Sequence, residues 1–324
     1  MIVITGGAGF IGSVLAAEIN RKWNRSDLLI VDKFDYKDAW KNLRNIKFEE
    51  YIHADEFIDL LDELNLDQID FIFHMGACSS TTENDVNYLF KNNTEYSKIL
   101  FEIATDHNIP FLYASSAATY GDGKLGYSDD PRSTKDLQPL NPYGFSKKLF
   151  DDFVLKQKKT PSTWAGFKFF NVFGPNEYHK ENMCSLVYKA VNQIKESGEV
   201  KLFKSHKDGF EDGKQLRDFV YVKDVVELML LSARKNKLKG IFNLGTGKAN
   251  SFYDLVDFTF KAMDKETNIK YIDMPENIRD QYQYYTQAEM DKLLKIFPEF
   301  KFKSLQESVF DYVQNYLLDD VTFY

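Results

Sequence analysis

Cysteine is scarce in this chain of 324 residues, which contains only Cys78 and Cys184. Two cysteines cannot build a disulfide framework or a cysteine-rich zinc centre, and no metal site is expected. No apolar run approaches the roughly 20 residues of a membrane-spanning helix. Positive charge is not in excess either, because 41 basic and 49 acidic residues give a net charge of −8. These absences argue against nucleic acid or a membrane as a partner, and the missing signal-peptide pattern predicts a cytoplasmic protein.

Short apolar segments and helical patterns alternate along the first half of the chain. Between the first two apolar segments, residues 11–23 carry apolar side chains at the spacing of an amphipathic helix. This alternation predicts parallel strands with helices on both faces, an α/β fold with a Rossmann-type doubly wound parallel sheet. The expected strands are 2–5, 28–32, 71–74, 111–115 and 164–171.

Beyond about residue 172 the pattern becomes irregular. A helix is expected over 187–194, and another over 223–233 lies between short strands at 219–221 and 240–244. The polar stretch 203–217 predicts a long exposed loop. The remaining residues mix helical and strand patterns, which indicates a smaller mixed α/β unit.

Three glycines follow the first expected strand, with Gly6, Gly9 and Gly12 spaced G-x-x-G-x-x-G. Glycine allows a tight turn, and its missing Cβ lets the backbone approach a pyrophosphate at the start of a helix. Asp32 ends the second strand twenty residues after Gly12, where a carboxylate can bind the adenosine ribose. The pattern predicts a dinucleotide site.

The choice between the two nicotinamide dinucleotides depends on the residues after this strand. Asp32 alone favours NAD, because its carboxylate would repel a 2′-phosphate. Lys33, Lys37 and Lys41 could hold that phosphate, or could simply be solvated surface lysines. We expect NADP, with NAD as the alternative.

The same patterns suggest two domains. Residues 1–171, with returns near 217–245, are expected to form the NAD(P)-binding Rossmann domain. Residues 172–216 and 246–324 are expected to form the substrate-binding domain.

Ser116, Tyr143 and Lys147 form a candidate catalytic group. Ser116 follows an expected strand at the sheet edge where ligands bind in such folds. Tyr143 and Lys147 are four residues apart on an expected helix, so both face one direction. An ammonium one turn away should lower the pKa of the phenol, and Ser116 would bind the substrate hydroxyl. Such a group can remove a proton from a carbinol while a hydride passes to the cofactor.

With these motifs the sequence resembles the extended short-chain dehydrogenases/reductases, a family that acts mainly on nucleotide sugars. The segments that carry the resemblance are 6–12, 115–121, 143–147, 217–224 and 242–247. Sugar dehydratases of this family use an adjacent Asp-Glu pair to eliminate water. Ala117 and Ala118 stand at those positions here and can act neither as acid nor as base, which disfavours dehydration.

Within the family, the chain most resembles the epimerases that invert ADP-heptose at C6″. The segments are 74–83, 111–121, 170–175 with His179 and Lys180, and 282–287. The resemblance implies an enzyme of the lipopolysaccharide core pathway that reduces and reoxidises a bound NADP in each turnover. It also implies oxidation at C6″ to a ketone, rotation of that ketone, and a second base, Lys180. A lysine can take that role only if burial or a neighbouring cation lowers its pKa.

The resemblance and the motifs together give two sets of binding residues. The cofactor set is Gly6, Gly9, Phe10, Ile11, Gly12, Asp32, Lys33, Gly76, Ala77, Cys78, Ser79, Asn92, Tyr143, Lys147, Val172 and Lys180. The substrate set is Ser116, Asn171, Asn182, Lys189, Phe203, Lys204, Ser205, His206, Arg217 and Tyr282. Arg217 suits a diphosphate, because a guanidinium donates in pairs to phosphate oxygens.

The sequence departs from the family pattern at several positions. Ala39 and Ala54 replace lysines near the adenosine phosphate, and Met75 replaces a glutamate of the cofactor segment. Asn182 and Lys189 replace a serine and a histidine near the sugar, and the 203–217 loop is longer than expected. Two alternatives therefore stay open: a 4-epimerase or reductase of another nucleotide sugar, and a non-catalytic NAD(P) sensor. A homo-oligomer is expected from the resemblance.

Overall fold

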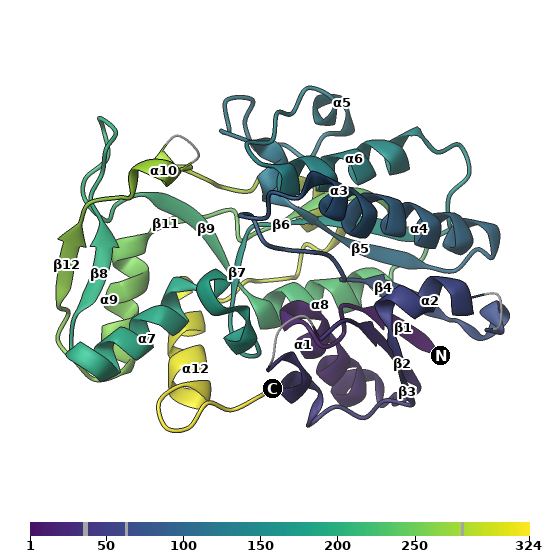
Figure 1. Cartoon of the computed structure of the whole chain (residues 1–324), viewed down its shortest axis with the longest axis horizontal. Helices are drawn as coiled ribbons and strands as arrows, with labels where there is room; N and C mark the ends of the chain where they lie inside the picture. The colour runs from purple at the N-terminus through teal and green to yellow at the C-terminus, as the bar shows by residue number, and fades with distance from the viewer. Residues whose placement is uncertain (35–37, 62–63, 280–281) are drawn as a thin grey trace.

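A parallel sheet of seven strands organises the protein (Figure 1). The computed structural model describes residues 1–34, 38–61, 64–279 and 282–324. The strand order is β10-β6-β5-β4-β1-β2-β3, and each neighbouring pair is parallel. The strands are β1 (Ile2–Thr5), β2 (Leu28–Asp32), β3 (Glu50–His53), β4 (Phe71–His74), β5 (Phe111–Ser116), β6 (Trp164–Phe169) and β10 (Lys239–Leu244).

Helices cover both faces of this sheet, and the strand residues alternate between two apolar cores. Ile2 and Ile4 of β1 pack in the core formed with α1 (Phe10–Glu18) and α8 (Val222–Ala233). Val3 points to the other core, formed with α2 (Ala54–Leu60), α4 (Tyr96–Asp106) and α6 (Pro142–Lys156). Figure 1 shows α6, α4 and the short α3 (Val86–Leu89) on one side and α1 and α8 on the other. The predicted doubly wound α/β fold is confirmed.

Strands predicted at 2–5, 28–32 and 71–74 have the bounds that the sequence indicated. The single strand predicted over 164–171 is wrong. It ends at Phe169, and the chain then enters a different sheet as β7 (Asn171–Phe173), which pairs with β9 (Leu216–Tyr221). The sequence analysis missed β3, where only Ile52 is buried, so the strand has no alternating pattern.

Two small sheets and several helices form the region drawn on the left of Figure 1. One sheet joins β7, β9 and β11 (Ala249–Ser251), and the other joins β8 (Val200–Phe203) to β12 (Ile269–Ile272). The helices there are α7 (Leu186–Ser197), α9 (Phe252–Ala262), α10 (Glu276–Arg279) and α12 (Leu305–Tyr316). The predicted division into two domains stays a prediction.

The remaining helical segments are short. They are α5 (Pro131–Thr134), α11 (Asp291–Ile296), π-helical turns at Ile19–Trp23 and Phe90–Glu95, and 3₁₀ turns at Ala39–Leu43, Leu66–Gln68, Ala117–Tyr120 and Tyr178–Met183. None of the helices in the described ranges is long and apolar enough to span a bilayer.

Candidate active site

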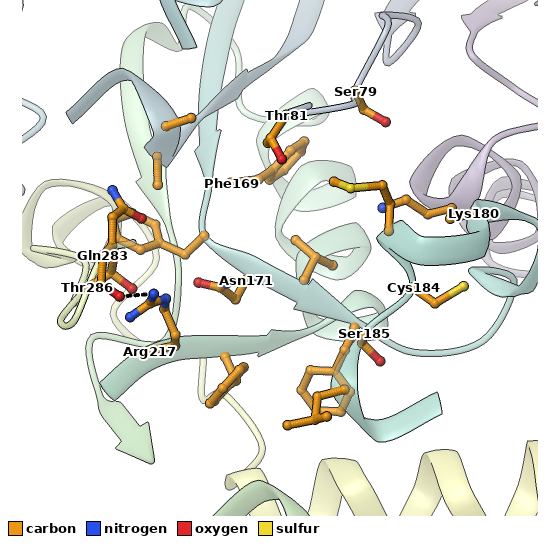
Figure 2. A pocket seen from close by; sticks show the side chains of 18 of the residues that line it. Ser79, Thr81, Phe169, Asn171, Lys180, Cys184, Ser185, Arg217, Gln283 and Thr286 are labelled. Carbon is orange, nitrogen blue, oxygen red and sulfur yellow. Dashed lines mark hydrogen bonds between the residues drawn. The ribbon is translucent and has the colours of Figure 1, made fainter. Parts of the chain in front are cut away.

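A cavity of about 1320 Å³ lies at the carboxyl ends of β4 and β5. Its wall includes residues that follow β4, the end of β5, and residues of α6, β7, α7 and β9. Ligands bind at this edge of open parallel sheets. Figure 2 shows Lys180 on one side of the cavity, Arg217 and Gln283 on the other, and Asn171 between them.

The glycine turn joins β1 to α1 in a backbone shape that only glycine fits well. Gly6 has φ +67°, and a Cβ at Gly12 would lie 2.1 Å from the Gly6 carbonyl oxygen. Helix α1 begins at Phe10 behind Gly9, and no side chain caps it. Its first N–H groups therefore lack intrahelical partners and point to where a pyrophosphate would bind. The turn fits the phosphates of a dinucleotide, and Phe10 and Ile11 line the cavity.

The Asp32 carboxylate holds this turn. Its Oδ2 accepts from the backbone N–H of Ala8 at 2.7 Å and of Gly9 at 3.1 Å, and its Oδ1 accepts from Lys33 N–H at 2.7 Å. Asp32 thus lies at the end of β2 beside the glycines, as the spacing predicted. A dinucleotide placed along the turn would bring its ribose to this carboxylate.

The Lys33 ammonium is already engaged. It donates to Asn92 Oδ1 at 3.1 Å and forms an ion pair with Asp55. The pKa of the Asp55 carboxyl is lowered chiefly by its hydrogen bond with Lys33. Lys37, the second candidate for a 2′-phosphate, lies outside the described residues. A phosphate at Lys33 would have to compete with Asp55.

The predicted cofactor segment 76–79 is held by Asn93. Its Oδ1 accepts from Cys78 N–H at 2.8 Å, and its Nδ2 donates to the Cys78 carbonyl at 2.9 Å and to Ser146 Oγ at 3.0 Å. Ala77 and Ser79 line the cavity, as does Val172 of β7. The predicted cofactor residues that lie outside its wall are Gly6, Gly9, Gly12, Asp32, Lys33, Gly76, Cys78 and Asn92.

Helix α6 brings Tyr143 and Lys147 to the cavity together with Ser116. The helix begins at Pro142, and Asn141 caps it by accepting from Gly144 N–H at 2.8 Å. Proline at the first position and an asparagine cap fix where this helix starts, and so which face carries the tyrosine. The structure therefore brings the predicted Ser116, Tyr143 and Lys147 to one place.

The expected lowering of the Tyr143 pKa by Lys147 is not found. Burial raises the pKa of the Tyr143 phenol, and a hydrogen bond with Ser116 opposes that shift. The Lys147 ammonium instead donates to the Ala114 carbonyl at 2.9 Å. Burial lowers the Lys147 pKa to about 8, while the Asp151 carboxylate acts in the opposite direction.

Asp151 lies one turn after Lys147 and belongs to a buried polar cluster. Its carboxylate pairs with Lys168 at 3.0 Å and accepts from Tyr113 Oη at 3.0 Å and Ser115 Oγ at 2.8 Å. Both members of the ion pair are almost fully buried, with side-chain exposures of 0% and 1%. Asp151 therefore ties α6 to the end of β5, next to Ser116.

Lys180 lies in the 3₁₀ turn Tyr178–Met183, between β7 and α7. It lines the cavity, and its Nζ lies 5.4 Å from the centre of the Phe10 ring at the start of α1. Burial lowers the Lys180 pKa, and Glu177 acts in the opposite direction. A lysine can act as a base near neutral pH only if its surroundings lower its pKa, and the pKa of Lys180 is shifted in that direction.

Arg217 lies in the part of the wall opposite Lys180 (Figure 2), and Tyr282 lines the same cavity. The guanidinium lies 5.2 Å from the centre of the Tyr282 ring and donates to the backbone carbonyls of Leu216, at 2.8 Å, and Gln283. Only 6% of Arg217 is exposed, and burial lowers its pKa. Those carbonyls leave further guanidinium N–H groups that can donate to a phosphate.

The other predicted substrate residues divide into two groups. Asn171, Lys189 and Phe203 line the cavity. Asn182 is exposed and outside the wall, where its carbonyl accepts from Lys189 Nζ at 2.7 Å. Lys204, Ser205 and His206 also lie outside the wall. Lys204 pairs with Asp273, Ser205 N–H donates to Asp212, and His206 Nε2 accepts from Met274 N–H.

Residues 2–245 match the family described as the NAD dependent epimerase/dehydratase family. The chain belongs to this family. It is 50% identical over 326 aligned positions to the ADP-L-glycero-D-manno-heptose-6-epimerase of Fusobacterium nucleatum, covering 98% of each chain. It is 46% identical over 318 positions to the enzyme of the same name from Nitratidesulfovibrio vulgaris, again covering 98% of each. The crystal structure of the Helicobacter pylori ADP-L-glycero-D-manno-heptose-6-epimerase superposes with a TM-score of 0.82 at 31% identity, covering 97% of this chain and 95% of that chain.

As a member of this family the protein is an epimerase-type enzyme, and its cavity contains polar residues that the sequence analysis did not assign. Five of them are Thr81, Ser185, Gln193, Gln283 and Thr286. A signal existed for three of them, because Thr81 belongs to the 74–83 segment, and Gln283 and Thr286 to the 282–287 segment, that carried the resemblance. Ser185 had a local signal as the N-cap of α7, where its Oγ accepts from Tyr188 N–H at 3.4 Å.

Proposed function

We propose that this enzyme converts ADP-D-glycero-β-D-manno-heptose into ADP-L-glycero-β-D-manno-heptose by epimerisation at C6″. The observation that carries the proposal is that Tyr143 and Lys180, on α6 and on the turn after β7, line one cavity. Inversion through a ketone that turns needs proton transfer at the C6″ oxygen in two orientations, one before and one after the ketone turns. Two proton-transfer groups on separate elements suit that requirement.

The atoms and electrons of the substrate balance within one turnover, and a proton must then pass through solvent from the residue that took it to the residue that donated it. A dinucleotide held at the turn of Gly6, Gly9 and Gly12 would supply the hydride acceptor for C6″ and the hydride donor for the other face of the ketone. In the oxidation, one of the two residues takes the hydroxyl proton as the C–H bond breaks. After the ketone has turned about its bond to the ring, the other residue donates a proton to the oxygen. Ser116 would bind that oxygen beside Tyr143.

The diphosphate of the substrate is proposed to lie at Arg217. The guanidinium there is buried against Tyr282 and Phe252, whose ring centres lie 5.2 Å and 5.5 Å away. Aromatic faces hold the planar guanidinium in place, so it can donate to phosphate oxygens with little reorganisation. This arrangement supports a nucleotide-sugar substrate that stretches from Arg217 toward Lys180.

The direct test is an NMR assay of the purified protein with ADP-D-glycero-D-manno-heptose. We expect the C6″ configuration to invert with no net formation of reduced dinucleotide. Lys180→Met should slow this inversion by about 10²-fold or more, because the second proton-transfer group is lost. If the protein binds a dinucleotide but leaves the heptose unchanged, a 4-epimerase or reductase of another nucleotide sugar replaces this proposal. If the heptose is inverted and Lys180→Met is fully active, Lys180 is not the second proton-transfer group.

For the cofactor we propose NADP, bound through displacement of Asp55 from Lys33. The support is the Lys33–Asp55 ion pair beside Asp32, because a 2′-phosphate could replace that carboxylate on the ammonium. We expect Asp55→Asn to tighten NADPH binding several-fold while NADH binding changes less than twofold. Fluorescence titration of dinucleotide-free protein measures both. An exposed control is Asp59→Asn, and a greater gain for NADH than for NADPH would assign the site to NAD.

The expected cytoplasmic location and homo-oligomer remain proposals as well. Exposed apolar side chains support self-association, since Val86 of α3 and Phe145 of α6 are 45% and 43% exposed. Apolar surface of this kind is often covered by another subunit. Light scattering of the purified protein should give a mass above that of one chain, and Phe145→Ser should lower it.

A further inference from the structure

A single buried carboxylate closes the segment that carries Lys180. Glu177 is only 1% exposed and lies between β7 and α7. Its Oε2 accepts from Ser185 N–H at 2.5 Å, and its Oε1 accepts from Ser185 Oγ at 2.6 Å and Gly174 N–H at 3.4 Å. Residues 174 and 185, which are the two ends of the segment, are therefore bound to the same side chain.

Lys180 lies within this closed segment, and its own backbone is tied to the same residue. The Lys180 N–H donates to the Glu177 carbonyl at 3.0 Å, and Cys184 Sγ donates to that carbonyl at 3.2 Å. Glu181, next to Lys180, has φ +48° and ψ −119°, a conformation that non-glycine residues rarely adopt. A strained residue persists only where surrounding contacts hold it, and the Glu177 contacts with Gly174 and Ser185 close the segment in which Glu181 lies.

Glu177 also influences the pKa of Lys180 through its charge. Burial lowers the Lys180 pKa, and Glu177 is the largest influence that raises it. Other titratable groups that influence Lys180 are Cys184, which also raises its pKa, and Lys189, which lowers it. The His179 pKa is lowered to about 4 by burial and by Lys180, so that imidazole is neutral near pH 7. Glu177 is thus the acidic side chain that most raises the Lys180 pKa.

We propose that Glu177 is the positioning residue for Lys180, fixing the backbone of residues 174–185 and aiming the lysine amine into the cavity. This inference rests on the proposed function, in which Lys180 is the second proton-transfer group. The two bonds from Ser185 to Glu177 would hold Lys180 in place without touching the substrate. Such bonds matter for the rate because small displacements of a reacting group reduce rates strongly. Removing the carboxylate should therefore affect the Lys180 step and leave the Tyr143 step intact.

The test compares Glu177→Gln with Lys180→Met and with wild type. Glutamine keeps the size of the side chain but cannot accept at both oxygens. Each variant is loaded with oxidised dinucleotide and mixed with one of the two C6″ epimers of ADP-glycero-D-manno-heptose. The near-ultraviolet absorbance of the reduced nicotinamide then reports oxidation from each epimer separately. The matched control is Glu181→Gln, which changes an exposed glutamate in the same segment.

We expect Lys180→Met to slow oxidation of one epimer, and Glu177→Gln to slow the same epimer about tenfold or more. The other epimer should be oxidised within about twofold of the wild-type rate, KM should change less than about threefold, and the control should match wild type. The double variant should be no slower than Lys180→Met alone, because the two residues act as a unit. Equal slowing of both epimers, additive losses in the double variant, or a wild-type rate for Glu177→Gln would overturn the proposal.

A separate outcome concerns the proposed function itself. If Lys180→Met slows neither epimer, Lys180 is not a base, and the failure belongs to the proposed function. If Glu177→Gln does not fold, Ser185→Ala is used instead, because it removes one of the bonds to Glu177. It should slow the Lys180-dependent epimer about threefold and spare the other, and equal slowing of both would overturn the proposal.

Discussion

Lys147 and Lys180 line the same cavity but are held in different ways. Lys147 lies on α6, a helix of fifteen residues that packs on β5, and its ammonium donates to a strand carbonyl. Lys180 lies in an irregular segment whose shape depends on side-chain hydrogen bonds. Each lysine nevertheless has a buried carboxylate close in sequence, Asp151 after Lys147 and Glu177 before Lys180, that opposes the effect of burial on its pKa.

The difference shows two ways of fixing a cation in a cavity. The backbone hydrogen bonds of α6 fix the position of Lys147, so the loss of one side-chain contact should displace Lys147 little. The Lys180 segment is a short 3₁₀ turn interrupted by the non-helical residue Glu181, so we expect individual side-chain bonds to matter more for its shape. We therefore expect large effects on chemistry at Tyr143, large effects on stability at Asp151, and smaller, more selective effects around Lys180.

The largest effect is expected from Tyr143→Phe. Removal of the phenol hydroxyl takes away the proton-transfer group on α6 without opening a cavity, so the rate should fall about 10²–10⁴-fold while folding is kept. Steady-state epimerisation and thermal unfolding measure the two quantities. Tyr285→Phe is the control, because Tyr285 is exposed and outside the cavity wall. A Tyr143→Phe enzyme that keeps more than about a tenth of the wild-type rate would assign the chemistry elsewhere.

The second effect is on stability and concerns the ion pair behind Lys147. Asp151→Asn leaves the Lys168 ammonium buried without its partner, which should lower the free energy of unfolding by about 3–5 kcal/mol. Asp152→Asn is the control, because Asp152 pairs with Lys148 closer to the surface and should cost no more than about 1 kcal/mol. The double variant Asp151→Asn/Lys168→Met removes both charges and should recover much of the loss. Urea unfolding decides, and equal losses in the two single variants would contradict the expectation.

The surroundings of Lys147 could be predicted from the sequence, and those of Lys180 could not. The fold class and three strand bounds followed from periodicity, because helix and strand spacing repeats along the chain. The Ser116–Tyr143–Lys147 arrangement followed from the end of a predicted strand and the four-residue spacing on a predicted helix. Lys180 came only from a resemblance, since an irregular segment has no period to read. Glu177 was missed for the same reason: its partners Gly174 and Ser185 meet only after the segment folds. Lys204 and His206 were predicted to bind substrate but lie outside the cavity wall. Their loop contacts Asp273 and Met274, which are distant in sequence, so no sequence pattern indicates these contacts.

A third prediction separates the charge of Lys147 from its position. Its pKa is about 8 in the folded protein, below the ordinary value of 10.5, because it is buried. If catalysis requires Lys147 in its charged form, kcat/KM should fall above pH 8 by up to tenfold per pH unit. The effect of Lys147 on stability has the opposite sign. Between pH 8 and 10.5 Lys147 binds more protons in the unfolded chain than in the folded protein, so its contribution to the free energy of unfolding rises with pH in that range.

This pH prediction has its own control variant. Asp151 raises the Lys147 pKa, so the double variant Asp151→Asn/Lys168→Met should move the falling limb of the kcat/KM profile to lower pH. Profiles of wild type and double variant, measured with unfolding curves at each pH, separate loss of charge from loss of fold. An unmoved limb would mean that Lys147 is not the group that titrates.

The smallest expected effect is a test of strain beside Lys180. Glu181 has a positive φ that glycine adopts at little cost, so Glu181→Gly should raise the free energy of unfolding by up to about 1 kcal/mol. The gain comes with a looser backbone next to Lys180, so kcat should fall about two- to fivefold. Lys237→Gly is the matched control, because Lys237 also has a positive φ, +61°, but lies outside the cavity wall. It should stabilise the protein to a similar degree with no change in kcat. If the two glycine variants instead change kcat equally, the conformation of Glu181 has no special connection to Lys180, and the side-chain contacts of Glu177 alone fix the lysine.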